Sequence, residues 1–391
     1  MSRTLKIGIG FDGMCADVSI MNLEPHLDLI PQEYPKLSRL IESVKAGRDE
    51  ELTCEAEGIT AQQFKEILSY VQGLPGVETD VHIGANCALE SVTAACLLKD
   101  PVPPVAPTEV NYLGFWSPLT LERVPESIPP QFLAKAKPIK DSEAISLIMP
   151  YKGKRAILSF GGSPPLRALS PTLKEYLREE VAACLRENSL HMLIVVGTAC
   201  TFSAARPEDF GILREIISTA QSGGTKVLVD LGGLGSWKEE SLKAYFAAIE
   251  RSDVLAMNES ELGVYYEKKT GKKAGGDNPR DCAQMILEVV RPDQGFLVHT
   301  PTFQLAFGFK EKEAVSKALD FASKAATLRG KEGYFPTARQ VIEADLKQQD
   351  VPGLEDIPPE FIAQKGYEAT VKNPVGLGDT WTCSFVLAYL G

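Results

Sequence analysis

A regular alternation of short apolar runs and amphipathic segments between residues 155 and 300 constrains the fold more than any other feature of the sequence. The short runs, rich in valine, isoleucine and leucine, are typical of buried strands, and the segments between them have the periodicity of amphipathic helices. The predicted strands read AILSFGG, HMLIVVGT, TKVLVDLGG, DVLAMN and GFLVHT. Strands that alternate with helices form right-handed units, which predicts an α/β fold with a mostly parallel sheet covered by helices on both faces.

The carboxyl ends of the predicted strands indicate where a ligand would bind, because open α/β sheets bind ligands at this edge. A further buried strand is predicted over residues 6–11, directly before Asp12. The residues expected along the edge are Asp12, Gly197, Asp230, Asn258, Thr300 and a glycine turn near residue 378.

Two segments differ from this pattern and predict a lid. Residues 18–81 combine amphipathic helices with charged loops, and residues 102–154 are rich in proline and lysine. The predicted large domain comprises residues 1–17, 82–101 and 155–391, and the predicted lid domain comprises residues 18–81 and 102–154. Lys152, Lys154 and Arg155, where the two domains meet, could hold an anionic group, although surface solubility is the simpler explanation.

Composition narrows the class of protein. With 391 residues, of which 44% are hydrophobic, the chain is long enough for one large α/β domain and a smaller one. The net charge of -11 argues against binding to nucleic acid or to anionic lipid, and no apolar run approaches the length of a membrane span. The eight cysteines form no CxxC pair and the four histidines lie far apart, so a zinc site is not expected. Scattered cysteines in apolar surroundings are typical of reduced thiols, so we expect a cytoplasmic protein. As to its assembly, we expect either a monomer or a small homo-oligomer.

Residues 376–380, with the sequence GLGDT, predict an anion site at the start of the last helix. Glycine lets the backbone approach a ligand closely, and a helix N-terminus aims free N–H groups at one point. Asp379 at this point would repel a bound phosphate, but it suits a general base that takes the proton from an attacking hydroxyl group. Alternatively, Asp379 is only the N-cap of the helix, a position that aspartate commonly takes.

Two further turns carry polar residues that suit a polyol ligand. Asp12 and Asp17 follow the first predicted strand, where a carboxylate can bind a sugar hydroxyl. Gly84 permits the close approach of a ligand, and Asn86 can both donate and accept hydrogen bonds. Each has a structural alternative, because aspartate is common in turns and Asn86 could be the N-cap of a buried helix.

Asn258 and Glu261 form an N-x-x-E motif at the end of a predicted strand and share one face of the following helix. A variant of the capping box explains this pair without any ligand. At the same edge of the sheet as the glycine turn, however, Glu261 suits a carboxylate that organises Mg²⁺, usually through water, for phosphoryl transfer.

These motifs, in this order, resemble those of the ribokinase-like sugar kinases, and most of all the ADP-dependent glucokinase and phosphofructokinase group. The resemblance is carried by GFD, HIGANCA, AMNESEL, LVHTPTFQLAFG and NPVGLGDT. It spans nearly the whole chain, and the chain length and the two-part lid are also similar to that group. The resemblance implies a ribokinase-like three-layer α/β/α domain that binds nucleotide and a smaller, discontinuous α+β lid domain.

The resemblance also implies a function, the Mg²⁺-dependent transfer of a phosphoryl group from ADP to a hydroxyl of a sugar or sugar phosphate. Asp379 is then the catalytic base and a metal ligand, and the phosphoryl group is bound by the amides of Gly376, Leu377 and Gly378. Glu261 organises Mg²⁺ with Asn258, and the nucleotide lies near Asn258, Thr300 and Asp230. The sugar is bound by Asp12 or Asp17 together with Gly84 and Asn86.

Two departures from the family pattern leave alternatives open. The strand before N-x-x-E lacks the H-x-E motif of the ADP-dependent group and reads Val229-Asp230-Leu231-Gly232. Either Asp230 takes the place of this motif in binding metal or phosphate, or the protein binds its phosphoryl donor in a different way. The N-terminal motif is shifted to Asp12-Gly-Met-Cys-Ala-Asp17, which leaves the acceptor sugar open. The alternatives are an ATP-dependent sugar or nucleoside kinase on the same scaffold and a catalytically silent protein that binds sugar or nucleotide.

Overall fold

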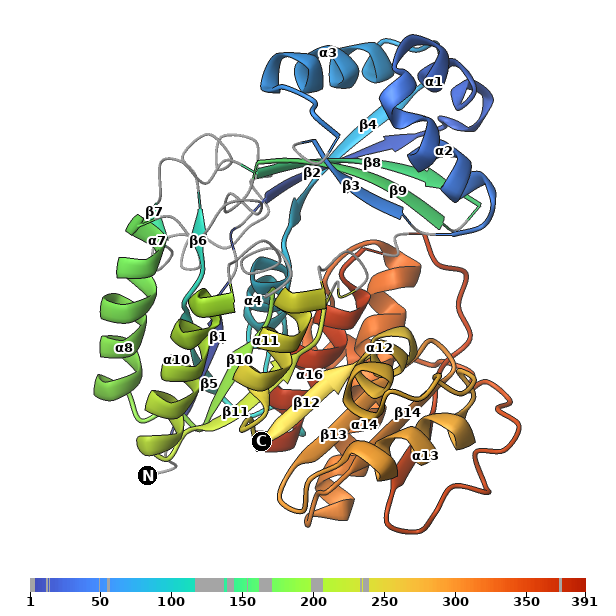
Figure 1. Cartoon of the computed structure of the whole chain (residues 1–391). Coiled ribbons are helices and arrows are strands. Elements are labelled where there is room, and N and C mark those ends of the chain that lie inside the picture. Colours follow the sequence, from blue (N-terminus) through green and yellow to red (C-terminus); the bar gives the residue numbers. More distant parts are fainter. Residues whose placement is uncertain are drawn as a thin grey trace.

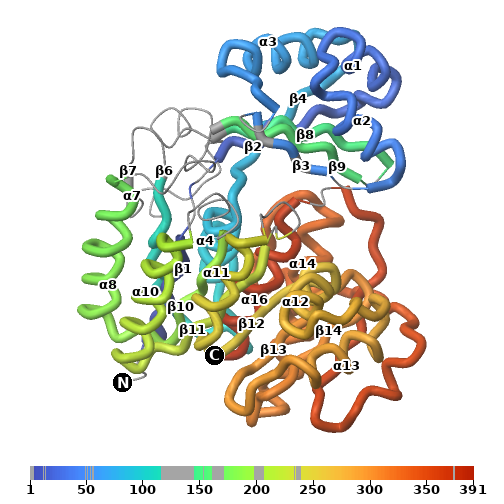
Figure 2. Tube along the Cα trace, in the orientation of Figure 1, coloured from blue at the N-terminus to red at the C-terminus, as the bar shows by residue number. Residues whose placement is uncertain are grey.

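The protein consists of a large α/β part and a smaller part, built on a separate sheet, that lies over one end of it (Figures 1 and 2). The computed structural model describes residues 4–11, 13, 15–48, 50–54, 57–116, 137–138, 144–152, 154–161, 171–197, 207–232, 234, 239–372 and 375–391.

Eight strands form the large sheet, in the order β15-β14-β13-β12-β11-β10-β1-β5. Their bounds are β1 (Leu5–Gly10), β5 (Thr108–Tyr112), β10 (Met192–Val195), β11 (Lys226–Asp230), β12 (Val254–Met257), β13 (Gly295–His299), β14 (Phe303–Phe307) and β15 (Ile362–Lys365). The strands from β5 to β13 in this order are parallel, and β14 and β15 add antiparallel strands at one edge. The mostly parallel sheet predicted from the alternating pattern is therefore confirmed.

Helices cover both faces of this sheet, so that alternate residues of one strand enter two separate cores. In β10, Leu193 and Val195 pack into one core, and Met192 and Ile194 pack into the other. The first core is covered by α7 (Pro171–Glu175), η3 (Tyr176–Val181), α8 (Ala182–Glu187), α10 (Phe210–Ser222), α11 (Glu239–Ile249), α12 (Glu259–Thr270) and α13 (Pro279–Val289). The second is covered by α4 (Asn86–Leu97), α14 (Lys312–Glu332), α15 (Ala338–Glu343) and α16 (Leu377–Leu390). Burial on both faces explains why the strands read as continuous apolar runs.

The smaller sheet has five strands in the order β3-β9-β8-β2-β4, and its helices pack over one face of it (Figure 1). The bounds are β2 (Cys15–Met21), β3 (Glu50–Thr53), β4 (Glu78–Gly84), β8 (Ala144–Tyr151), β9 (Lys154–Gly161), α1 (Leu29–Glu33), α2 (Ser38–Lys45) and α3 (Ala61–Gln72). Short elements complete the described chain, namely η1 (Glu24–His26), η2 (Pro35–Leu37), β6 (Phe115–Trp116), β7 (Lys137–Pro138) and η4 (Pro207–Asp209).

Two strands lie in a different sheet from the one that the sequence suggested. β5 falls within the proline-rich segment predicted as lid, yet it pairs with β1 in the large sheet. β9, predicted as the first strand of the regular pattern, pairs with β8 and β3 in the small sheet. An apolar run suits a strand in either sheet, because periodicity reports which faces are buried and not which strand is the partner. The predicted domain boundaries themselves remain a prediction.

Helix α16 is apolar on all sides, as expected of a helix that is surrounded by protein. Its residues from Asp379 to Ala388 are buried, and α14 and α4 pack against it. Among the described residues, no helix combines the length and the apolar character that crossing a membrane would require.

Candidate active site

The glycine turn before α16 is built as an anion-binding helix start would be. Gly376 occupies the N-cap position with φ of 71° and makes no side-chain cap, a backbone conformation that glycine adopts without strain. Leu377 and Gly378 form the start of the helix, and Asp379 is the third helical residue. The alternative that Asp379 is the N-cap is therefore wrong, because Gly376 takes that position, and the aspartate carboxyl group needs another explanation.

Asp379 is almost fully buried, with a relative exposure of 9%. Burial, and next the negative charge of Asp230, raise the pKa of Asp379 to about 7, whereas the backbone and Arg155 act in the opposite direction. Asp17 also raises the pKa of Asp379. Because Arg155 lies on β9 of the small sheet, both parts of the protein contribute charges to this carboxyl group.

Asp230, the last residue of β11, lies next to the first turns of α16. The hydroxyl of Thr382 donates a hydrogen bond of 2.6 Å to Oδ2 of Asp230. Burial raises the pKa of Asp230 to about 6, although the bond from Thr382 lowers it. The structure therefore brings two of the predicted site residues, Asp230 and Asp379, together from elements far apart in the sequence.

Two close approaches involve the residues predicted to bind the sugar, one between Gly84 and Asp17 and one between Asn86 and Gly232. A Cβ atom on Gly84 would lie only 2.3 Å from the carboxyl group of Asp17, so any larger residue where β4 ends against β2 would displace this side chain. A Cβ atom on Gly232, just after β11, would lie 2.7 Å from Nδ2 of Asn86. Asn86 is the first residue of α4 and follows Ala85, which is the N-cap, so the alternative of Asn86 as N-cap is wrong. Asp12 lies outside the described residues.

Asn258 and Glu261 form a complete capping box at the start of α12. The backbone N–H of Asn258 donates to Oε2 of Glu261, and the backbone N–H of Glu261 donates to Oδ1 of Asn258, each at 2.9 Å. This is the structural role expected of the motif without a ligand. The additional roles of Asn258 at the nucleotide and of Glu261 at Mg²⁺ remain predictions.

Thr300 organises the turn between β13 and β14. Its hydroxyl oxygen accepts hydrogen bonds from the backbone N–H groups of Thr302 and Phe303. The same hydroxyl donates a hydrogen bond of 2.9 Å to the carbonyl oxygen of Phe303. The hydroxyl is thus engaged by its own turn, and a contact of Thr300 with nucleotide remains a prediction.

Two residues that the sequence interpretation left out also lie at this edge. Glu90, in the second turn of α4, has no exposed surface, and its pKa is raised well above the usual value by burial and by Asp230 and Asp379. His299 ends β13, and a Cβ atom on Gly378 would lie 3.1 Å from its ring. The sequence contains one signal that could have pointed to Glu90, which is the single charged residue of the helix NCALESVTAACL. Glutamate is almost never fully buried unless it is paired, so a lone glutamate in an apolar helix is unusual.

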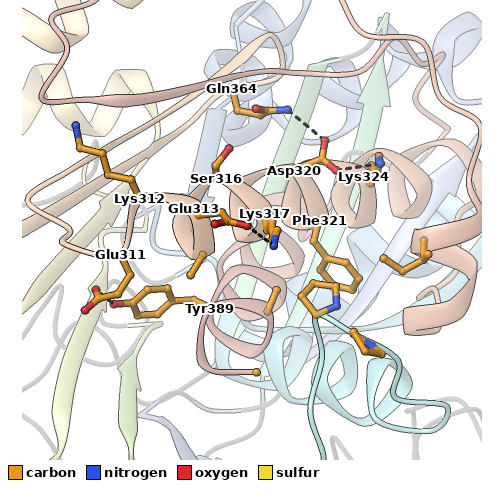
Figure 3. A pocket seen from close by; sticks show the side chains of 16 residues that line it. Glu311, Lys312, Glu313, Ser316, Lys317, Asp320, Phe321, Lys324, Gln364 and Tyr389 are labelled. Carbon is orange, nitrogen blue, oxygen red and sulfur yellow. Dashed lines mark hydrogen bonds and ion pairs between the residues drawn. The ribbon is translucent and has the colours of Figure 1, made fainter.

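A cavity of about 1090 Å³ lies at the opposite end of α16, between Tyr389 and the first turns of α14. Four of its charged side chains form two ion pairs, Lys317 with Glu313 and Lys324 with Asp320 (Figure 3). A helix of this length spans about 20 Å, so the cavity is remote from Asp379. We therefore place the candidate site at the carboxylate group and not at this cavity.

Comparison with known proteins supports the fold expected from the motifs. No family model and no curated protein matches the sequence. An ADP-dependent kinase solved in complex with fructose-6-phosphate and ADPβS superimposes with a TM-score of 0.69 at 14% identity, covering 98% of this chain and 93% of that chain. A phosphofructokinase from Pyrococcus horikoshii OT3, solved with AMP, gives a TM-score of 0.65 at 12% identity, with 99% and 98% covered.

A third structure, the last common ancestor of ADP-dependent phosphofructokinases from Methanosarcinales, gives a TM-score of 0.65 at 14% identity, with 99% and 94% covered. The match over the whole length includes both the large sheet and the smaller one. The chain therefore has the ribokinase-like α/β fold of ADP-dependent kinases, with a three-layer domain and a second, smaller α+β part, as the motifs implied.

Proposed function

We propose that the protein is a Mg²⁺-dependent kinase that transfers a phosphoryl group from ADP to a hydroxyl group of a sugar or sugar phosphate. The observation that carries the proposal is the buried Asp379 in the first turn of a helix that begins at a glycine with positive φ. The full-length similarity to an ADP-dependent kinase that was solved with fructose-6-phosphate and an ADP analogue supports both substrates.

Asp379 is suited to accept the proton of the acceptor hydroxyl. A general base works best when its pKa lies close to the operating pH, and burial with the charge of Asp230 brings the pKa of Asp379 to about 7. The hydroxyl oxygen, as it loses its proton to Asp379, attacks the β-phosphorus of ADP in line, and the bond from this phosphorus to the bridging oxygen breaks so that AMP leaves. The backbone N–H groups at Leu377 and Gly378 bind the charge that develops on the transferred phosphoryl group.

Carboxylates at this edge would serve as ligands of the divalent cation that phosphoryl transfer requires, although no group of three or more metal-ligating side chains lies together among the described residues. Mg²⁺ prefers oxygen ligands, commonly one or two carboxylates together with water and substrate phosphates. Asp230 and Asp379 offer such oxygens, with Glu261 as the further ligand implied by the motif. When bound with the nucleotide, Mg²⁺ supplies charge neutralisation at the phosphate oxygens.

The acceptor is proposed to lie between the two parts of the protein. Asp17 on β2 and Asn86 on α4 present polar groups at the place where the small sheet meets the large one. Carboxylate and amide groups together can bind several hydroxyl groups of one sugar. Arg155 of β9 acts on Asp379 from the small sheet, which fits a lid that excludes water when it covers the substrate.

The test is an assay of phosphoryl transfer with a panel of sugars, sugar phosphates and nucleosides, using ADP and ATP in parallel with Mg²⁺. Formation of AMP together with a phosphorylated sugar is the expected result. Product from ATP alone would support the ATP-dependent alternative, which is favoured by Asp230 standing where the H-x-E motif is expected. Stabilisation by nucleotide without any product would support the silent binding protein.

The setting proposed for this activity is the cytoplasm. Every cysteine in the part of the chain that the structure describes is a free thiol, as proteins of reducing compartments usually have. Fractionation of cells that express the protein tests the location, and light scattering of the purified protein tests whether it is a monomer or a small homo-oligomer.

A further inference from the structure

The two faces of the smaller sheet differ in character. On one face, apolar residues such as Val18 of β2, Leu147 of β8 and Leu158 of β9 pack into the core beneath α1, α2 and α3. The residues between them on each strand point to the opposite face, because side chains alternate along a strand. This inner face is turned toward the large part of the protein (Figures 1 and 2).

A row of polar residues crosses the inner face. Asp17 of β2 is the register partner of His82 on β4 and of Ser146 on β8. Ser146 is in turn the partner of Ser159 on β9. Partners on neighbouring strands carry their side chains on the same face, and the hydroxyl oxygens of Ser146 and Ser159 lie 3.3 Å apart, within hydrogen-bond distance. His82, Asp17, Ser146 and Ser159 therefore form one polar row across four strands.

The polar row is sheltered although the apolar core lies on the other face of the sheet. Asp17 has a relative exposure of only 5%, and His82, Ser146 and Ser159 are half-buried. Sheltered polar side chains are more informative than exposed ones, because burial of a polar group needs a reason. A cross-strand serine pair can also stabilise a sheet, so a purely structural role is the alternative that an experiment must exclude.

The polar row reaches the candidate active site at Asp17. The carboxyl group of Asp17 lies 2.3 Å from the position that a Cβ atom on Gly84 would take, and α4 begins two residues later with Asn86. The side chain of Asn86 lies against Gly232, directly after β11. The last residue of β11 is hydrogen-bonded to Thr382 of α16. Successive close approaches thus lead from the polar row to the helix that begins at the glycine turn.

The chemistry of the polar row suits a neutral polyol. The carboxylate of Asp17 accepts hydrogen bonds, and the hydroxyl groups of Ser146 and Ser159 can each donate and accept. Neighbouring strands lie about 4.8 Å apart, so Asp17 and Ser159 stand about 10 Å apart across the sheet. Several hydroxyl groups of one ligand can therefore be contacted at once. Because none of these three side chains carries a positive charge, they suit hydroxyl groups and not a phosphate group.

We propose that Ser146 and Ser159, in line with Asp17, bind hydroxyl groups of the acceptor and so determine which sugar is phosphorylated. The inference rests on the proposed function, because that function supplies the acceptor. It adds a second set of contacts to the residues that the motifs assign to the sugar. Those residues lie where the chain passes between the two parts, at Gly84 and Asn86, whereas Ser146 and Ser159 lie further across the small sheet.

The experiment is calorimetry of the full-length protein with D-glucose, D-fructose, D-ribose and their phosphate esters. The monodeoxy analogues of the sugar that binds most tightly are then measured in the same way. In Ser146→Ala and in Ser159→Ala we expect the Kd for that sugar to rise about 2- to 10-fold, as for the loss of one hydrogen bond between uncharged groups. Ser69→Ala is the matched control, because Ser69 is exposed on α3, on the other side of the sheet, and should leave the Kd unchanged.

The deoxy analogues separate contact with the sugar from support of the sheet. An analogue that lacks the hydroxyl bound by Ser146 should bind the wild type more weakly than the parent sugar does, yet bind Ser146→Ala as well as the parent does. If the serines only stabilise the sheet, each variant will weaken the parent sugar and every analogue by the same factor. That pattern, an unchanged Kd in both folded variants, or the absence of binding by any of these sugars would overturn the proposal.

Calorimetry also distinguishes failure of the inference from failure of the proposed function, because it needs no turnover. Sugar binding that depends on Ser146 and Ser159 in a protein that phosphorylates no sugar would leave the inference standing and remove the kinase. Phosphoryl transfer to a sugar that binds both variants as tightly as the wild type would leave the kinase and remove the inference.

Discussion

Two acidic regions at the edge of the large sheet differ in how their carboxyl groups are satisfied. At the start of α12, the backbone N–H groups of Asn258 and Glu261 each donate a hydrogen bond of 2.9 Å to the side chain of the other residue, so the carboxylate of Glu261 has a structural role. Where α4 meets α16, Glu90 has no hydrogen-bond partner in the described structure, and Asp379 is buried with a raised pKa. The carboxylate named by the motif is thus stabilised locally, whereas the carboxyl groups that the fold assembles are buried at a cost in free energy.

The largest effect expected is the loss of activity in Asp379→Asn. Removing a general base costs about 10²- to 10⁴-fold in turnover, because the acceptor hydroxyl then keeps its proton until late in the attack. Steady-state kinetics with the acceptor found in the panel measures this loss. The control is Asp356→Asn at an exposed position of similar chemistry. Turnover of Asp379→Asn close to that of the wild type would remove Asp379 from the mechanism.

The next expected effect is a dependence of turnover on pH. Only the ionised form of Asp379 can accept a proton, and its pKa is raised to about 7. Turnover should therefore be highest above neutral pH and fall about tenfold for each unit below the pKa. The profile of kcat against pH measures this, with saturating substrate at every point. A flat profile down to the ordinary range of a carboxyl group would show that the pKa of Asp379 is not raised in the working enzyme.

The raised pKa of Asp379 also predicts how the stability of the protein depends on pH. The folded protein raises the pKa of Asp379 from 3.8 to about 7, so the native state binds this proton more tightly than the unfolded chain does. The stabilisation that follows is fully present below pH 3.8 and is lost as the pH rises through about 7. Asp379→Asn should therefore have a higher Tm than the wild type at neutral pH, and the difference should shrink on acidification. Thermal unfolding over a pH series tests this, and a lower Tm of the variant at neutral pH would contradict it.

The smallest effects are expected at the capping box. Glu261→Ala removes one of its two bonds and should lower the free energy of unfolding by about 1 kcal/mol, whereas Glu261→Gln can keep the bond because glutamine also suits this position. Chemical denaturation measures the difference between the two variants. The predicted role at Mg²⁺ is tested in the same pair, since both variants lose the charge and should then need more Mg²⁺ for half-maximal turnover. Equal stability of the two variants would show that the cap contributes little.

Much of the fold was predictable because its signals are local. The parallel sheet followed from apolar runs that alternate with amphipathic helices, and the start of α16 followed from glycines that permit an unusual backbone conformation. The sheets to which β5 and β9 belong were not predictable in the same way, because the sequence of an apolar strand does not specify which strand it pairs with. At the site, the sequence predicted the position of Thr300 after β13. It did not predict that the Thr300 hydroxyl forms hydrogen bonds within its own turn, because these depend on the backbone geometry of the turn.

The residue types at the carboxyl ends of the strands can be read directly from the sequence, namely Asp230 at the end of β11, Asn258 after β12 and Asp379 in the glycine turn. Which of them share one environment depends on how the chain packs. Asp230 and Thr382, 152 positions apart, are joined by a hydrogen bond, and because α4 packs on α16, the charge of Asp379 raises the pKa of Glu90. The physical reason is that burial and charge act through space, so the pKa of each carboxyl group depends on neighbours that no stretch of sequence contains.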